Sequence, residues 1–210
     1  MARDKILHKV RTALGRSPGQ PTPPPPPARL RLPEVTLDQR IDAFVRALET
    51  LAGKVFVAAS PEEALAYTAN LCEGRTAVAS NAPLLAECGI TRLAAVQSGF
   101  HERAPLRAAC AQAGIGITSA DYALADTGSL VMFSCPAEAR LISLLPPVHL
   151  AVVDRRRLLT GLDELYSLHP LPSGETSAMV FITGPSRTAD IEQILIRGVH
   201  GPREIHVVLV

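Results

Sequence analysis

The chain has 210 residues, of which 47% are hydrophobic and 20% are charged, and its formal net charge is +1. A chain of this length and composition can bury a full core as one domain, which excludes disorder throughout. The long apolar run at residues 141–153 is interrupted by two prolines and a histidine. It is shorter than the roughly 20 residues that cross a bilayer, so no membrane span is expected.

The N-terminus and the cysteines indicate where the protein works. Residues 1–16 lack the apolar core and small-residue cleavage site of a secretory signal, so a cytoplasmic protein is expected. The four cysteines, Cys72, Cys88, Cys110 and Cys135, have no C-x-x-C spacing and no histidine at zinc-ligand spacing. No metal and no iron-sulfur cluster is therefore expected on this chain. Three of the four lie among Ala and Leu in expected helices and are predicted to be core thiols.

A basic arm precedes the main part of the chain. Residues 1–32 hold seven Lys or Arg and one acid, a net charge of +6, so the remainder carries −5. A helix with Ile6, Val10 and Leu14 on one face is predicted, followed by a proline-rich linker, so residues 1–35 form an arm and residues 36–210 a domain. The apolar face is expected to dock on a partner subunit or on a second copy of the chain. No nucleic-acid partner is expected, because the body is acidic.

Strands and helices then alternate. Thr36 to Gln39 is a capping box that begins a helix, and Gly53 is predicted to end that helix in a left-handed cap. Apolar strands are expected at residues 55–60, 75–80, 92–97 and 114–119, with helices at 61–73, 83–88 and 103–113. Continuously apolar strands separated by helices predict an α/β fold, a mostly parallel Rossmann-like sheet with helices on both faces.

The regular alternation of strands and helices ends after residue 120. Strands are expected at 129–134, 140–147 and 149–154, including an antiparallel pair whose turn is 135–139, and a helix is expected at 155–168. A strand at 177–183, a short helix and a strand at 204–210 close the chain and bring the strand count to nine.

The first candidate site is the sequence FITGPSRTADIE. Gly184 to Thr188 follows an apolar strand and precedes an expected helix, and in doubly wound sheets such loops bind ligands. The hydroxyls of Ser186 and Thr188, the Arg187 guanidinium and free amides at a helix start are suited to an anion. The alternative is a turn with an ordinary helix cap, in which Asp190 pairs with Arg187. His200, in the sequence GVHGP, is either a further site residue or part of a turn.

The second candidate site is the sequence DTGS. Asp126 is a possible base, nucleophile or acceptor, and Thr127, Gly128 and Ser129 are possible ligand contacts. The same four residues also make good turn chemistry. His149 follows two prolines at the start of an apolar strand, a position more typical of a structural histidine. The absence of G-x-G-x-x-G, P-loop, G-x-S-x-G and H-E-x-x-H sequences argues against the corresponding nucleotide, hydrolase and zinc-protease classes.

Three linked motifs carry a resemblance. The sequences GITSADYALADTGSLV, RLISLLPPVHLAVV and FITGPSRTADIE with GVHGP, in this order, closely resemble the LUD (lactate-utilization) domain family of the LutC/YkgG type. The resemblance implies a fold similar to the NagB/RpiA/CoA-transferase-like sheet. It also implies a role beside two iron-sulfur partner proteins in oxidising L-lactate to pyruvate, with the clusters held by those partners.

The working hypothesis is a single pocket at the carboxyl edge of the sheet. Gly184 to Thr188, Thr127 to Ser129 and His149 would line it, and it would bind a 2-hydroxy acid or a phosphate-bearing cofactor. Arg187 would hold the anion, and His149 or Asp126 would transfer the proton. Two alternatives stay open: a stand-alone enzyme on small phosphorylated or acyl substrates, by analogy with the fold, and a non-catalytic assembly subunit.

Overall fold

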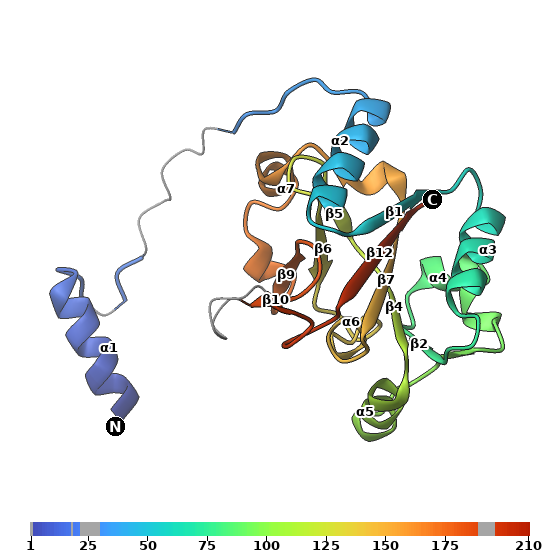
Figure 1. The fold of residues 1–210 in the computed structure, drawn as a ribbon. Helices are drawn as coiled ribbons and strands as arrows, with labels where there is room; N and C mark the ends of the chain where they lie inside the picture. Colours follow the sequence, from blue (N-terminus) through green and yellow to red (C-terminus); the bar gives the residue numbers. More distant parts are fainter. Residues whose placement is uncertain (1, 18, 22–29, 189–195) are drawn as a thin grey trace.

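The structure, a computed structural model, describes residues 2–17, 19–21, 30–188 and 196–210. Its body is built on a six-stranded parallel sheet with the strand order β1-β12-β7-β4-β2-β3 (Figure 1). A four-stranded sheet with the order β8-β5-β6-β9 packs against one face of it. The predicted α/β class with a mostly parallel sheet is confirmed.

The described residues contain seven α-helices and twelve strands, rather than the nine strands expected. The helices are α1 (Ala2–Ala13), α2 (Leu37–Thr50), α3 (Pro61–Leu71), α4 (Pro83–Glu87), α5 (Arg103–Gln112), α6 (Leu141–Leu144) and α7 (Leu162–Leu168). The parallel sheet contains β1 (Lys54–Val57), β2 (Ala77–Ala79), β3 (Val96–Gln97), β4 (Ile115–Ser119), β7 (Val148–Val153) and β12 (Glu204–Leu209). The other strands are β5 (Tyr122–Leu124), β6 (Ser129–Phe133), β8 (Leu158–Leu159), β9 (Met179–Ile182), β10 (Arg187–Thr188) and β11 (Ile196–Arg197).

Both faces of the parallel sheet are covered, which is why its strands are continuously apolar. All six residues of β7 are buried. On one face, Ile117 and Leu150 pack with Leu85 of α4. The other face is shared: Ala151 and its neighbours pack under α2 and the small sheet, while α5 and α6 cover β2 and β4. Three of the cysteines, Cys72, Cys88 and Cys110, are buried as predicted, and Cys135 is exposed.

Helix α2 begins as predicted and ends differently. The Thr36 side chain accepts a hydrogen bond from the Gln39 amide, and the Gln39 side chain accepts one from the Thr36 amide, which completes the capping box. At the other end, Ala52 rather than Gly53 has the left-handed conformation, with φ of 64°. Gly53 serves close packing instead, because a Cβ there would lie within 3 Å of the Leu48 side chain.

The predicted strand at 140–147 is wrong, because residues 141–144 form α6. A short apolar run has no period that separates strand from helix. β4 and β7 are already direct neighbours, so this segment cannot enter the sheet between them. It instead crosses the sheet face, and the Ile142 carbonyl lies against Gly116 of β4 so closely that a Cβ at residue 116 would overlap the carbonyl oxygen.

The antiparallel pairing is also placed differently from the prediction. In the small sheet the antiparallel pairs are β5 with β6, joined by the turn at residues 125–128, and β6 with β9, and β10 pairs separately with β11. The expected helix at 155–168 is divided, because Leu158 and Leu159 pair with β5 and α7 begins only after Gly161. The segment before Asp126 is strand β5, which was not among the nine expected strands. The short helix expected after Thr188 falls largely outside the described residues.

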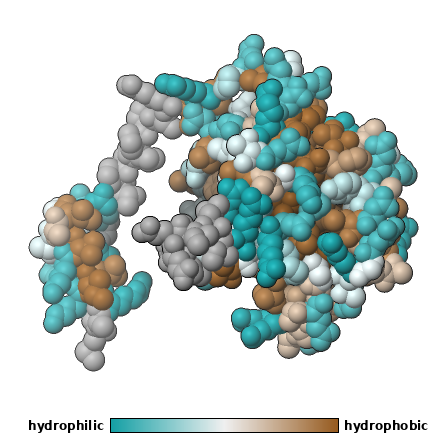
Figure 2. Space-filling view, in the orientation of Figure 1, coloured by the Kyte–Doolittle hydropathy of each residue, from teal (hydrophilic) through white to brown (hydrophobic). Residues whose placement is uncertain are grey.

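Helix α1 lies apart from the body and carries its apolar residues on the surface (Figures 1 and 2). Ile6, Val10 and Leu14 are 62%, 50% and 64% exposed. Across the described residues, no helix has both the length and the apolar character needed to cross a bilayer.

We expect Gly116→Ala to destabilise the fold by about 2 kcal/mol, because an added methyl group forces the α6 backbone away from β4. Gly114→Ala is the matched control. A Cβ at Gly114 finds its nearest neighbour at 3.5 Å, an ordinary contact, so this variant should be neutral or slightly more stable. Denaturant unfolding of the two variants measures the difference, and equal midpoints would contradict the packing.

Candidate functional site

The two segments singled out in the sequence lie side by side. The Ser129 hydroxyl donates a 2.8 Å hydrogen bond to Thr127 Oγ1 and shares a 2.7 Å hydrogen bond with Thr183 Oγ1. Ser129 begins β6 and Thr183 follows β9, and these strands are antiparallel neighbours. Three hydroxyl groups are therefore joined in a row at this end of the small sheet.

The glycines of these two segments pack closely against the C-terminal end of α2. Gly128 and Gly184 have φ of 65° and 81°, which favours glycine. A Cβ on Gly128 would lie 2.6 Å from the Leu48 amide nitrogen, and one on Gly184 would lie 3.0 Å from Leu51 Cβ. The Arg187 guanidinium donates to the Leu51 carbonyl. Both segments are thus fastened to the C-terminal end of α2.

Asp126 lies away from His149. The Asp126 amide donates a 3.1 Å hydrogen bond to the Thr160 carbonyl, and its side chain lines a separate cavity with Arg31 and Gly161. Asp126 and Thr127 are exposed, whereas the next two residues of the turn are buried. The two residues predicted to transfer protons therefore belong to different cavities.

Four of the predicted site residues line one small cavity of about 220 Å³: His149, Gly184, Ser186 and His200. The loop that carries His200 is held to Ser186 by backbone hydrogen bonds, because the Ser186 amide donates to the Pro202 carbonyl and the Gly198 amide donates to the Ser186 carbonyl, both at 3.0 Å. The cavity is therefore bounded by two loops that are hydrogen-bonded to each other.

His149 is one of two buried polar residues in the described lining of this cavity, together with Ser143. Its side chain is 1% exposed, and its Nε2 lies 2.8 Å from the Thr118 hydroxyl. Its Nδ1 has no hydrogen-bond partner among the described residues. Burial lowers the pKa of His149 to about 4, so the imidazole is neutral at pH 7 and its second nitrogen can still exchange a hydrogen bond with a ligand.

The cavity is at the opposite edge from the one predicted. His149 is the second residue of β7, so the cavity lies at the amino-terminal half of the parallel strands. The prediction treated residues 177–183 as a strand of the parallel sheet, but β9 belongs to the antiparallel sheet, where the carboxyl-edge rule does not apply. Thr188 is in β10, paired with Ile196, and Asp190 lies outside the described residues.

The carboxyl edge holds a polar cluster that was not predicted. Glu138 Oε1 accepts hydrogen bonds from the Ser80 hydroxyl at 2.9 Å, from the Ser119 amide at 2.8 Å and from the Ser119 hydroxyl at 2.9 Å. Ser80 follows β2 and Ser119 ends β4, so the cluster lies where the chain leaves these two neighbouring strands in opposite directions across the sheet. Such a switch point is the usual ligand position in a doubly wound sheet.

Glu138 is 7% exposed, and its Oε2 has no partner in the described part of the chain. Desolvation raises its pKa to about 7, with a smaller contribution from the charge of Asp121. The sequence did contain a signal for the cluster, because both apolar strands that precede the switch point end in serine. In the described residues, no three His, Cys, Asp or Glu side chains are placed to hold a metal ion together.

Comparison with known proteins identifies the family. The family model of the LUD domain matches residues 41–210, which include the parallel sheet, the small sheet and the His149 cavity. The chain belongs to the LUD domain family. The match leaves out the basic arm and the first turn of α2.

The family includes proteins that resemble this LUD chain over different lengths. It is 44% identical over 95 residues to Lactate utilization protein C of Halalkalibacterium halodurans, covering 43% of this chain and 41% of that protein. It is 37% identical over 103 residues to the Bacillus subtilis protein of the same name, covering 47% and 43%. The matched stretch thus spans about two fifths of these relatives. The similarity to YkgG of Escherichia coli is 30% over 217 residues and covers 95% of this chain and 94% of that protein.

A solved structure supports the fold. The crystal structure of a DUF162 family protein from Deinococcus radiodurans matches with a TM-score of 0.65, covering 84% of this LUD chain and 99% of that chain. The sequence identity is 18%, so this likeness bears on the fold alone.

The raised pKa of Glu138 predicts that the stability of the fold depends on pH. Its pKa is raised from 4.5 to about 7 on folding, so the folded state binds the proton more tightly, and this stabilisation is lost as the pH rises through that window. As the pH rises from 5 to 8, the free energy of unfolding of Glu138→Gln should increase relative to that of the parent chain by on the order of 3 kcal/mol. Denaturant unfolding across this pH range measures it. Glu73→Gln, at an exposed acid, is the control for removal of a carboxyl group, and a pH-independent difference between Glu138→Gln and the parent chain would contradict the assignment.

Proposed function

We propose that this LUD chain is a subunit of a lactate-utilization system that supports oxidation of L-lactate to pyruvate together with iron-sulfur partner proteins. The similarity to proteins named Lactate utilization protein C supports the pathway, although the match spans about two fifths of those proteins. In this proposal the chain binds the small anionic ligand, and the partner proteins accept the electrons.

The observation that carries the proposal is the His149 cavity. At about 220 Å³ it is smaller than the roughly 300–1,000 Å³ of pockets for drug-sized ligands, so it suits a molecule of a few heavy atoms. It is lined by His149, whose buried Nδ1 has no partner among the described residues, together with Ser186 and His200. A 2-hydroxy acid has a hydroxyl group for the imidazole and a carboxylate for the polar groups of the two loops.

The role of His149 follows from its protonation state. As a neutral imidazole at pH 7 it can accept the proton of the lactate hydroxyl when that carbon is oxidised. Oxidation to pyruvate removes two electrons and two protons. His149 takes the hydroxyl proton, the proton of the C–H bond is released, and both electrons go to the partner proteins. A bound carboxylate raises the pKa of the imidazole, because a nearby negative charge favours the protonated form.

Helix α1 supports the subunit part of the proposal. A stripe of three exposed apolar side chains on a basic helix needs a surface to cover it, and the helix stands away from its own body (Figure 1). We assign α1 to docking on a partner protein of the system or on a second copy of the chain.

The substrate site is tested with His149→Gln. We expect at least about a tenfold loss of L-lactate binding, and of lactate-dependent electron transfer in the complex reconstituted with the partner proteins, because the imidazole contact is lost. His206→Gln is the matched control. His206 is a buried histidine of the same sheet, hydrogen-bonded to Tyr67 at 2.7 Å, and it does not line the cavity. Equal effects of the two variants would contradict the site.

The docking role is tested by replacing Ile6, Val10 and Leu14 together with Ser. Association with the partner proteins, or self-association, should weaken at least about tenfold, since three apolar side chains lose their burial. The melting temperature of the body should not change. His8→Ser with Thr12→Ser alters exposed positions of the same helix that are outside the stripe and serves as the control. Unchanged association of the triple variant in analytical ultracentrifugation would refute the role.

A further inference from the structure

A second and larger cavity lies on the other side of α6. Its volume is about 880 Å³, four times the 220 Å³ of the His149 cavity. Ser143 and Leu144 line the smaller cavity, whereas Arg140, Leu141 and Leu145 line the larger one. The larger cavity is within the range that holds ligands of drug or nucleotide size.

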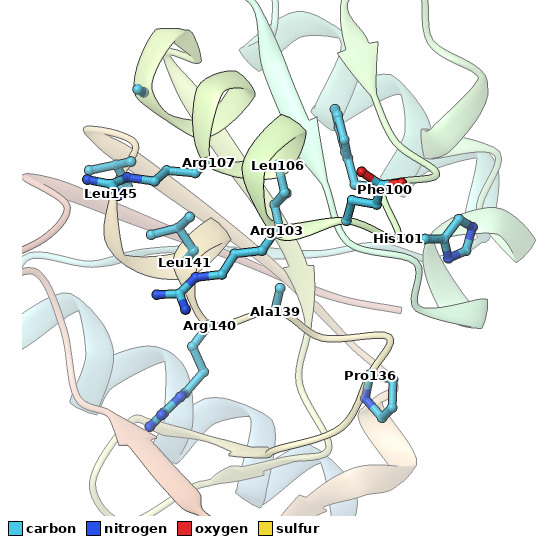
Figure 3. Close-up of a pocket in the computed structure, with 12 residues that line it drawn as sticks. Phe100, His101, Arg103, Leu106, Arg107, Pro136, Ala139, Arg140, Leu141 and Leu145 are labelled. Carbon is cyan, nitrogen blue, oxygen red and sulfur yellow. The ribbon is translucent and has the colours of Figure 1, made fainter.

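Three arginines face this cavity from two walls. Arg103 and Arg107 are one turn apart on α5, and Arg140 comes from the segment that leads into α6. All three line the cavity, and Figure 3 shows Arg103 and Arg107 extending from α5 and Arg140 extending from the segment before α6. None of the three side chains forms an ion pair or a hydrogen bond with another described residue. The lining also contains His101 and one acid, Glu102.

This grouping of positive charge is suited to an anion with several oxygens. The three positively charged guanidinium groups repel one another. A multivalent anion bound in the cavity is attracted to all three, and this attraction offsets their repulsion. The planar fork of arginine donates paired hydrogen bonds to phosphate. α5 begins at Arg103, so the positive end of its helix dipole lies at the same wall, beside the carboxylate of Glu102.

The rest of the lining is apolar. Phe100 and Leu106 lie beside the arginines on one wall, and Pro136 and Leu141 lie on the other. Such a surface favours a ligand that carries an apolar or aromatic body as well as charge. A lone inorganic anion would leave it uncovered.

The cavity also adjoins the switch point of the parallel sheet. Ala139 and Arg140 line it, and they directly follow Glu138, which bonds to the ends of β2 and β4. Asn81, the second residue after β2, holds the Phe100 carbonyl at 2.8 Å. The arginine cavity is therefore built from the segments that leave the carboxyl edge, where ligands of this fold class bind.

We propose that the cavity formed by Arg103, Arg107 and Arg140 binds a phosphate-bearing ligand with an aromatic or apolar body, of nucleotide size. The phosphates contact the three arginines, and the body rests on Phe100 and Leu141. This site is separate from the His149 cavity and binds a second ligand, so its occupancy does not depend on the substrate proposed above.

The test uses the full chain and three probes, ADP, pyrophosphate and adenosine, in isothermal titration calorimetry. ADP should bind more tightly than pyrophosphate, which lacks the body, and than adenosine, which lacks the phosphates. The double variant Arg103→Gln with Arg140→Gln should lose at least about tenfold in ADP affinity. Arg92→Gln, an exposed arginine that does not line the cavity, should bind ADP as the parent chain does.

Several results would overturn the proposal. These are no ADP binding to the parent chain at millimolar concentration, adenosine binding as tight as ADP binding, or equal ADP affinity in the double variant and in Arg92→Gln. The last result would mean that ADP binds elsewhere on the chain. His149→Gln should keep its ADP affinity, so failure of the lactate site and failure of this site give different results. Melting temperatures verify that the exposed substitutions leave the fold intact.

Discussion

The contact between Gly116 and Ile142 determines how this side of the sheet is covered. Because residue 116 has no side chain, the backbone of α6 lies directly on β4, with the Ile142 carbonyl against the strand. His149 is the neighbour of Gly116 in the sheet register, so the same contact puts α6 beside the buried imidazole. The two cavities on this face both depend on α6 lying in this position, since residues of the α6 segment line each of them. A glycine without any ligand contact thus fixes the space that ligands would occupy.

The sequence was a good guide wherever burial on both faces imposed continuous apolar strands. Residues 77–79, 115–119, 148–153 and 204–209 all form strands of the parallel sheet as expected, and the capping box set the start of α2. The segment after residue 120 was misread for a physical reason. There the chain leaves the parallel sheet and forms short pieces whose type is decided by tertiary partners: Leu158 and Leu159 become a strand by pairing with β5, and Leu141 to Leu144 become a helix because they pack on a glycine. The local sequence pattern contains no information about either of these two tertiary contacts.

The site could be predicted in part, for a related reason. Residue type and spacing pointed to His149, Gly184, Ser186 and His200, which line one cavity. They do not distinguish a ligand contact from a packing contact: Gly128, expected to contact a ligand, packs against α2, whereas Gly184 both lines the cavity and packs against Leu51. The rule that ligands collect at carboxyl edges was sound but was applied to β9, which is antiparallel to its neighbour. Applied to the two strands that end in serine, it leads to Ser80, Ser119 and, through them, Glu138.

The wall between the two cavities is thin and stiff. It consists of a single helical turn, and the Ser143 hydroxyl donates a 3.0 Å hydrogen bond to the Arg140 carbonyl, which joins the residue facing the smaller cavity to the residue facing the larger one. The same turn therefore contributes one wall to each cavity. The short helix thus shapes both cavities, while each cavity keeps its own set of lining residues.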